Sequence, residues 1–216
     1  QMCANVDQMM IVVAIRPPIP PLMLDSHIIA AVNGGISPVI LVNKCDLEPG
    51  PDDEPLPNMT VYENLGYKVV RCSTKSLSGM DDLHAALNNK TSILVGQSGV
   101  GKSSLVNALL PDAKARVGGL SDYSGLGAHT TTHAELHHIA RGGDLIDCAG
   151  FRDFGTWHFS HEEIQEGFEE VAKHALECKY NNCKHRTEPG CKVLEAVERG
   201  EIAESRLEAF HELTVP

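Results

Sequence analysis

The first part of the chain, up to about residue 150, alternates short apolar runs with polar loops and with segments of helical periodicity. Short apolar runs that end in Gly, Pro or Asn are typical of strands buried on both faces of a sheet. We expect such strands at Met9–Ile15, Val39–Val42, Tyr67–Arg71 and Thr91–Val95. We expect helices at Leu22–Asn33, Met80–Asn88 and Lys102–Leu110. Strands that alternate with helices predict an α/β fold with a mostly parallel sheet, covered on both faces.

The pattern changes near residue 155, after which helical periodicity dominates. Ser160 and Glu163 have the spacing of a capping box, a side-chain pair that starts many helices. Apolar residues follow at helical spacing from Ile164 to Ala175. Two further strands and two further helices complete the pattern, at Thr132–Ile139, Asp144–Asp147, Val193–Arg199 and Ala203–Leu213. We therefore expect an α/β domain at residues 1–155 and a small helical domain at residues 156–216.

Composition and charge narrow the class of protein. The chain has 216 residues, of which 42% are apolar and 22% charged, as in ordinary globular proteins. No apolar run reaches the roughly 18 residues that a membrane span needs. The net charge of −11 argues against a general nucleic-acid binder, although residues 178–192 carry a local excess of Lys and Arg. No secretory signal is present and a strand-like run begins almost at once, so we expect a cytoplasmic monomer with no membrane partner, whose natural sequence starts earlier.

The strongest motif is the glycine-rich loop that ends at Lys102. It matches the P-loop pattern G-x-x-x-x-G-K-[ST], in the strand–loop–helix context that the pattern requires. In such a loop the backbone N–H groups cradle a triphosphate, Lys102 reaches the β- and γ-phosphates, and Ser103 holds Mg²⁺. A chance Gly-rich turn is the alternative. The nucleotide-binding candidates are Gly96, Gln97, Ser98, Gly99, Val100, Gly101, Lys102, Ser103 and Ser104.

Two further motifs indicate that the base is guanine. Residues 43–46 (Asn-Lys-Cys-Asp) follow a strand and fit the guanine-reading pattern N-K-x-D. The Asp46 carboxylate can accept from the ring N–H and the exocyclic amine of guanine, whereas adenine would leave it under-satisfied. We expect Asn43 to bond the base edge or the P-loop, and the Lys44 stem to lie on the ring face. The second motif is the loop that supports the base, of the S-A-K type, which we expect at Ser73, Thr74 and Lys75. The alternative for both motifs is an ordinary polar turn.

The residues expected to sense the γ-phosphate follow the P-loop. Thr130 and Thr131 supply hydroxyls for Mg²⁺ and the γ-phosphate, and we expect Thr131 to be the magnesium ligand. Asp147 and Gly150 form a D-x-x-G motif, which brings a carboxylate toward Mg²⁺ and an N–H to the γ-phosphate. Ordinary GTPases place the P-loop first, whereas here the guanine motifs come first, which is a circular permutation. The permutation leaves the site intact because every motif stays at the carboxyl end of a strand in one sheet.

Cys178, Cys183, His185 and Cys191 have the spacing of a structural zinc site. Three thiolates and one imidazole make a closed tetrahedral set, with no open position for catalysis. The other cysteines lie in apolar or motif contexts, and an odd total of seven argues for a reducing compartment. A buried cysteine cluster with an incidental His, or a disulfide, is the alternative.

With these motifs in this order, the chain resembles the RsgA family, also called YjeQ or YloQ, of ribosome-dependent GTPases. The resemblance rests on residues 4–8, 43–47, 96–104, 129–132, 147–151 and 178–191. It implies a circularly permuted P-loop GTPase fold with a C-terminal helical zinc-binding subdomain, and the cofactors GTP or GDP, Mg²⁺ and Zn²⁺. It also implies GTP hydrolysis stimulated by the small (30S) ribosomal subunit during its late maturation. Family members usually carry an N-terminal OB-fold, which this sequence does not contain, so we expect it to be a fragment.

Two departures from the family pattern, and one from GTPases in general, affect the mechanism. Cys148 and Ala149 replace the Thr and Pro of the family's D-T-P-G motif, and Ala128 replaces an Arg. Phe151 stands where many GTPases place the Gln that orients the attacking water. We therefore expect slow intrinsic hydrolysis, with His129 as the candidate that orients water on the ribosome. The alternative is that His129 only contacts rRNA or solvent.

Two other functions remain open from the sequence. One is a permuted GTPase of large-subunit assembly, against which the zinc site speaks. The other is an RNA-binding zinc module that holds nucleotide without turnover, against which the intact Lys102, Ser103 and Asp147 speak. The basic loop 178–191 is the expected rRNA contact, and a solvated charged face is its alternative.

Overall fold

The computed structural model describes residues 5–20, 22–111, 134–148 and 159–215. The chain forms two compact units. Unit 1 contains residues 1–19 and 36–153, and unit 2 contains residues 20–35 and 154–216. Among the described residues, no helix is both long enough and apolar enough to cross a membrane.

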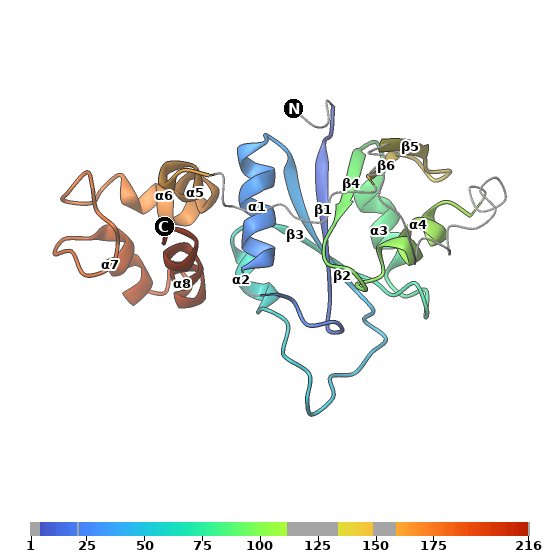
Figure 1. Cartoon of the computed structure of the whole chain (residues 1–216), viewed down its shortest axis with the longest axis horizontal. Coiled ribbons are helices and arrows are strands. Elements are labelled where there is room, and N and C mark those ends of the chain that lie inside the picture. Colours follow the sequence, from blue (N-terminus) through green and yellow to red (C-terminus); the bar gives the residue numbers. More distant parts are fainter. Residues whose placement is uncertain (1–4, 21, 112–133, 149–158, 216) are drawn as a thin grey trace, which may run out of the picture. The chain divides into compact units, whose positions relative to one another are not determined.

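Unit 1 is built on a six-stranded sheet with the order β3-β2-β1-β4-β6-β5 (Figure 1). The strands are β1 (Gln8–Ala14), β2 (Ser37–Asn43), β3 (Lys68–Arg71), β4 (Thr91–Val95), β5 (Ala134–His138) and β6 (Asp144–Cys148). Every pair is parallel except β5 with β6 at one edge of the sheet. The mostly parallel sheet expected from the sequence is confirmed.

The central strand β1 shows why the apolar runs are uninterrupted. All seven of its residues are buried. Met10 and Val12 belong to a core with Leu83 and Leu87. Met9, Ile11 and Val13 are buried as well, and because side chains alternate along a strand they lie on the opposite face of the sheet. A strand covered on both faces has no solvent-facing side, so period-two alternation is absent from its sequence.

In the described part of unit 1 there are three helices: α2 (Met59–Asn64), α3 (Met80–Leu87) and α4 (Lys102–Leu109). The first of these was not expected from the sequence. It has only six residues, too few to show a periodic apolar stripe, and it begins at Asn58, whose side chain accepts from the N–H of Thr60 at 3.1 Å. That cap residue was the one available signal.

Unit 2 is helical, with α1 (Met23–Asn33), α5 (His161–Gly167), α6 (Glu169–Ala175), α7 (Lys192–Glu198) and α8 (Glu204–Leu213). The capping box is confirmed, because Ser160 and Glu163 exchange hydrogen bonds at the start of α5. The periodic stretch after Ser160 forms two helices rather than one. The helix is interrupted at Phe168. The buried ring of Phe168 packs edge-on against the ring of Phe210, with 5.6 Å between the ring centroids.

Helix α1 lies far in sequence from the rest of unit 2. It packs against α5, and the Asn33 side chain donates to the carbonyl of Glu163 at 3.0 Å. Ile29 joins the core formed by Phe168, Val171 and Phe210. A helix that follows β1 along the chain is therefore part of the same compact unit as the C-terminal helices.

Candidate functional site

The candidate nucleotide motifs reach one edge of the sheet. Because β1, β2, β3, β4 and β6 are parallel, their carboxyl ends share that edge. The N-K-x-D motif follows β2, the Ser73 loop follows β3, and the P-loop follows β4. The sheet order places the base-reading strands on one side of β1 and the P-loop strand on the other. A nucleotide lying along this edge would cross the end of β1.

Two glycines let the P-loop approach its neighbours closely. Gly96 has a φ of +133°, and a Cβ there would lie 2.3 Å from the carbonyl oxygen of Val12 in β1. Gly101 has a φ of +100°, and a Cβ there would lie 2.4 Å from Nδ2 of Asn43. Neither position has room for a side chain, and both have a left-handed backbone that favours glycine. The loop is thus fitted against β1 and against the base-reading motif.

Lys102 lies back over the P-loop. Its Nζ donates to the carbonyl oxygens of Gly96 and Gln97, at 2.5 and 2.7 Å. Ser103 and Ser104 are exposed in the first turn of α4, where backbone N–H groups have no partner within a helix. An ammonium group beside a helix N-terminus suits an anion such as phosphate.

The N-K-x-D motif is hydrogen-bonded to the P-loop. The buried Asn43 side chain donates from Nδ2 to the carbonyl of Val100 at 2.9 Å. Lys44 donates from Nζ to the carbonyl of Gly99 at 2.7 Å. Of the two partners considered for Asn43, the contact in the structure is with the P-loop. The two motifs that would hold opposite ends of a nucleotide therefore share direct hydrogen bonds.

The Asp46 carboxylate is held by the loop that follows β3. Its Oδ1 accepts from Oγ of Ser73 at 2.6 Å, and that hydroxyl in turn accepts from the backbone N–H groups of Lys75 and Ser76. The hydrogen bond from Ser73 is the main reason that the pKa of Asp46 lies below its ordinary value. Thr74 is half-buried beside it. The result is a charged, oriented acceptor of the kind that guanine recognition requires.

The predicted γ-phosphate sensors are only partly covered by the structure. His129, Thr130, Thr131 and Gly150 lie outside the described residues, and so does the side chain of Asp147. The backbone of Asp147 belongs to β6, which pairs in parallel with the P-loop strand β4. The D-x-x-G motif therefore starts from the strand next to the P-loop.

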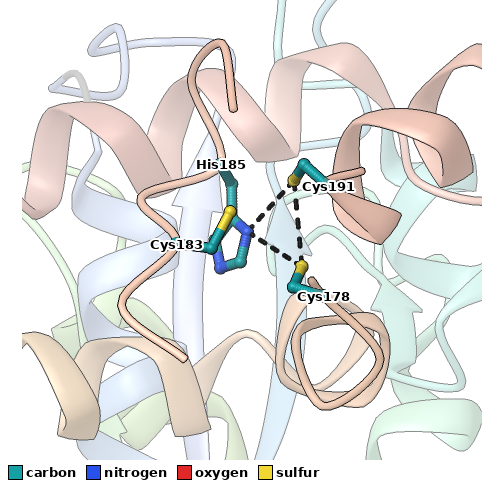
Figure 2. A group of neighbouring side chains, drawn as sticks. All are labelled: Cys178, Cys183, His185 and Cys191. Atoms are coloured by element: carbon teal, nitrogen blue, oxygen red, sulfur yellow. Dashed lines mark hydrogen bonds between the residues drawn. The ribbon is translucent and has the colours of Figure 1, made fainter. Parts of the chain in front are cut away.

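The predicted metal ligands come together in unit 2. Figure 2 shows Cys178, Cys183, His185 and Cys191 facing one centre, and their ligand atoms all lie within 4.8 Å of one another. Nδ1 of His185 is 3.7 Å from Sγ of Cys178 and 3.3 Å from Sγ of Cys191, and those two sulfurs are 3.9 Å apart. A tetrahedral zinc ion with Zn–S bonds of about 2.3 Å separates its ligand atoms by about 3.8 Å. The donor set and its spacing therefore fit Zn²⁺.

The chemistry of the thiols fits a cation as well. Cys183, His185 and Cys191 are buried, and burial raises the pKa of the Cys191 thiol to about 12. Without a cation such a thiol would stay protonated, whereas zinc binds the thiolate. The ligand loop is also held by Glu188, whose carboxylate accepts from three backbone N–H groups, those of Lys184, Arg186 and Thr187.

One ion pair near the nucleotide motifs was not expected from the sequence. Arg16, just after β1, contacts Asp53 in the acidic loop between β2 and α2. The two residues lie in different loops and belong to no recognised motif. The sequence offered no signal for this pair beyond the charges themselves.

Comparison with known proteins identifies relatives of this arrangement. The family model described as RsgA GTPase matches residues 1–157. The chain is 44% identical over 210 residues to the small ribosomal subunit biogenesis GTPase RsgA of Chromohalobacter salexigens. It is 46% identical over 216 residues to the protein of the same name from Klebsiella pneumoniae. These alignments cover 97% of this chain but only 62% and 60% of the relatives, so the chain spans about three fifths of their length.

Solved structures agree with the fold. The chain resembles the crystal structure of YjeQ from Thermotoga maritima with a TM-score of 0.75 at 33% identity, covering 98% of this chain and 71% of that one. It resembles the structure of YloQ, described as a circularly permuted GTPase, with a TM-score of 0.74 at 31% identity, covering 97% and 67% of the two chains. The circularly permuted GTPase fold expected from the motif order is therefore confirmed.

Proposed function

Because this chain belongs to the RsgA GTPase family, we propose that it binds GTP with Mg²⁺ and hydrolyses it to GDP and phosphate. The observation that carries the proposal is the junction of the base-reading motif and the P-loop. Asn43 and Lys44 donate directly to the carbonyls of Val100 and Gly99. This junction fixes the distance between a guanine-reading carboxylate and a phosphate-binding loop.

Each end of the nucleotide has its own residues in this proposal. Asp46 accepts from the guanine N–H groups, and the Lys44 stem covers the ring. At the other end Lys102 exchanges its loop carbonyls for the β- and γ-phosphates. Ser103 and Thr131 would hold Mg²⁺, which neutralises charge that develops on the phosphate oxygens. Asp147, Gly150 and Thr130 complete the γ-phosphate side.

We assign the orientation of the attacking water to His129, because Phe151 cannot orient water. The expected result of His129→Ala is a large loss of stimulated turnover with unchanged GDP affinity. Unchanged stimulated turnover in that variant would overturn the assignment. His137→Ala, in strand β5, serves as the matched histidine control.

The partner we propose is the small ribosomal subunit, for whose biogenesis the relatives are named. Those names favour the small over the large subunit. Contact with rRNA is assigned to the basic loop of unit 2, where Lys179, Lys184 and Arg186 accompany the exposed Tyr180. Zinc held by the Cys₃His set gives this loop its shape. We further propose that the protein acts as a cytoplasmic monomer, with its GTPase function in residues 1–155 and its zinc function in residues 156–216.

The test is GTP turnover alone, with purified 30S subunits and with 50S subunits, using ATP as the control nucleotide. We expect slow turnover alone and selective stimulation by 30S. Stimulation by 50S only, or equal use of ATP, would contradict the proposal. If the chain binds GTP but 30S subunits do not stimulate its turnover, the longer natural protein is assayed in the same way. If 30S subunits do not stimulate that protein either, the proposed partner is wrong.

A further inference from the structure

Arg16 lies at the end of β1, the strand that separates the base-reading motifs from the P-loop. Its guanidinium forms a multidentate ion pair with the carboxylate of Asp53. Nε donates to both carboxylate oxygens at 2.7 and 2.9 Å, and Nη2 donates to Oδ2 at 2.5 Å. Oδ2 also accepts from the backbone N–H of Gly50 at 2.6 Å. Several hydrogen bonds between one guanidinium and one carboxylate fix the orientation of the two groups better than a single contact does.

The backbone of Arg16 faces the nucleotide motifs. Its carbonyl oxygen accepts from Nζ of Lys44 at 2.8 Å, and the same ammonium donates to Gly99 of the P-loop at 2.7 Å. Lys44 thus spans from the end of β1 to the P-loop. A continuous series of contacts leads from Asp53 through Arg16 and Lys44 to Gly99, although Asp53 belongs to none of the nucleotide motifs.

We propose that Arg16 and Asp53 are positioning residues for Lys44, so that the acidic loop between β2 and α2 sets the affinity for guanine nucleotides without touching them. The inference rests on the proposed function. Among the residues that the structure describes, the Arg16 carbonyl is one of two acceptors that hold the Lys44 ammonium, and the Asp53 carboxylate holds the segment that carries this carbonyl. If the segment loosens, Lys44 loses an acceptor, and its stem no longer has a fixed place beside the guanine ring.

A surface ion pair without a role in binding makes a different prediction. The Arg16 side chain is 48% exposed and that of Asp53 is 15% exposed, and ion pairs with a solvent-exposed partner contribute little to stability. Removing the pair should therefore leave the melting temperature nearly unchanged. A purely structural pair would leave nucleotide affinity unchanged as well, whereas a positioning pair would not.

The experiment measures the affinity of the full chain for fluorescent GDP in four proteins: wild type, Asp53→Asn, Lys44→Met and the double variant. We expect Asp53→Asn to weaken binding by about 3- to 10-fold, the effect of a lost hydrogen-bonded contact. In the Lys44→Met background the same substitution should cost nothing further, because its effect passes through Lys44. Wild-type affinity in Asp53→Asn, or an equal loss in both backgrounds, would overturn the inference.

Two more variants keep the test decisive. Gly50→Ala retains both charges but places a Cβ 2.8 Å from Nη2 of Arg16, so it should displace the guanidinium and weaken binding in the same direction. This variant replaces Asp53→Asn if the latter fails to fold. Arg141→Gln removes an exposed ion pair with Asp81 at 2.8 Å and should bind GDP like wild type. If the wild-type protein binds no guanine nucleotide, the proposed function fails. If the wild-type protein binds GDP and Asp53→Asn binds it equally well, only the positioning role of Asp53 fails.

Discussion

The two units hold their functional side chains by different means. In unit 1 the nucleotide motifs come from separate strands, and the sheet brings them to one edge. Their contacts are hydrogen bonds between side chains and backbone, such as those of Asn43 and Lys44 with the P-loop. In unit 2 the four ligands come from one short segment, and Cys183 and Cys191 are themselves part of the hydrophobic core. The site of unit 1 is therefore shaped by contacts across the sheet, whereas the four-residue cluster of unit 2 is built into a hydrophobic core and is compatible with a bound zinc ion.

Removing zinc should produce the largest difference between the units. Structural zinc sites supply about 10–16 kcal/mol of apparent binding free energy, which is also folding free energy. We expect a chelator, or Cys183→Ser, to unfold the region around α7 and α8 while GDP affinity is retained. Hydrogen exchange followed peptide by peptide measures both units in one sample. Metal analysis confirms that the zinc has been removed. If the amide hydrogens of α8 are then as protected from exchange as before, the core of unit 2 is stable without the ion.

A smaller but still large effect is expected from the charged centre of unit 2. Arg206 is 2% exposed, donates to the carboxylates of Asp25 and Glu170, and lies over the ring of Phe168 at 4.2 Å. Arg206→Met should destabilise unit 2 by about 3–5 kcal/mol, because two buried carboxylates lose their shared partner.

The matched triple variant separates charge from packing. Adding Asp25→Asn and Glu170→Gln to Arg206→Met removes the uncompensated charges, so much of the stability should return. Urea unfolding with hydrogen exchange as the readout measures this. If the triple variant is no more stable than Arg206→Met, lost packing against Phe168 is the cause. GDP affinity should be unchanged throughout, because no nucleotide motif belongs to unit 2.

The third effect falls on unit 1 alone. Asp46→Asn replaces an acceptor of two N–H groups with an amide, and we expect GDP affinity to fall by about 10- to 100-fold. Xanthosine diphosphate has a carbonyl in place of the exocyclic amine, so the variant should bind it better than wild type does. Asp82→Asn, at an exposed position in α3, is the control. Equal GDP affinity in Asp46→Asn and wild type would remove Asp46 from the base site.

The sequence predicted most of this architecture because each motif is local. The P-loop, N-K-x-D and Cys₃His patterns are contiguous or nearly so, and a parallel sheet needs apolar strands such as β1 that are easily recognised. The contacts that cross the fold were not predictable. The pair of Arg16 with Asp53 joins two loops, and Asp25 meets Arg206 across 181 positions of sequence. A charged residue in a helix carries no local mark of a distant partner, so a sequence pattern cannot pair it with one.

The smallest effect concerns the pH dependence of unit 1. His84 in α3 is half-buried, its Nδ1 has no hydrogen-bond partner among the described residues, and burial is the main cause that lowers its pKa from 6.5. Above that pH the ring is neutral in both the folded and the unfolded chain. As pH falls through 6.5, the unfolded chain takes up the proton first, so the stability of unit 1 should decline toward acid pH. His84→Gln should slightly flatten the decline between about pH 7.5 and about pH 5.5. Urea midpoints of unit 1 at both values test this, and identical slopes in variant and wild type would place the acid sensitivity in other groups.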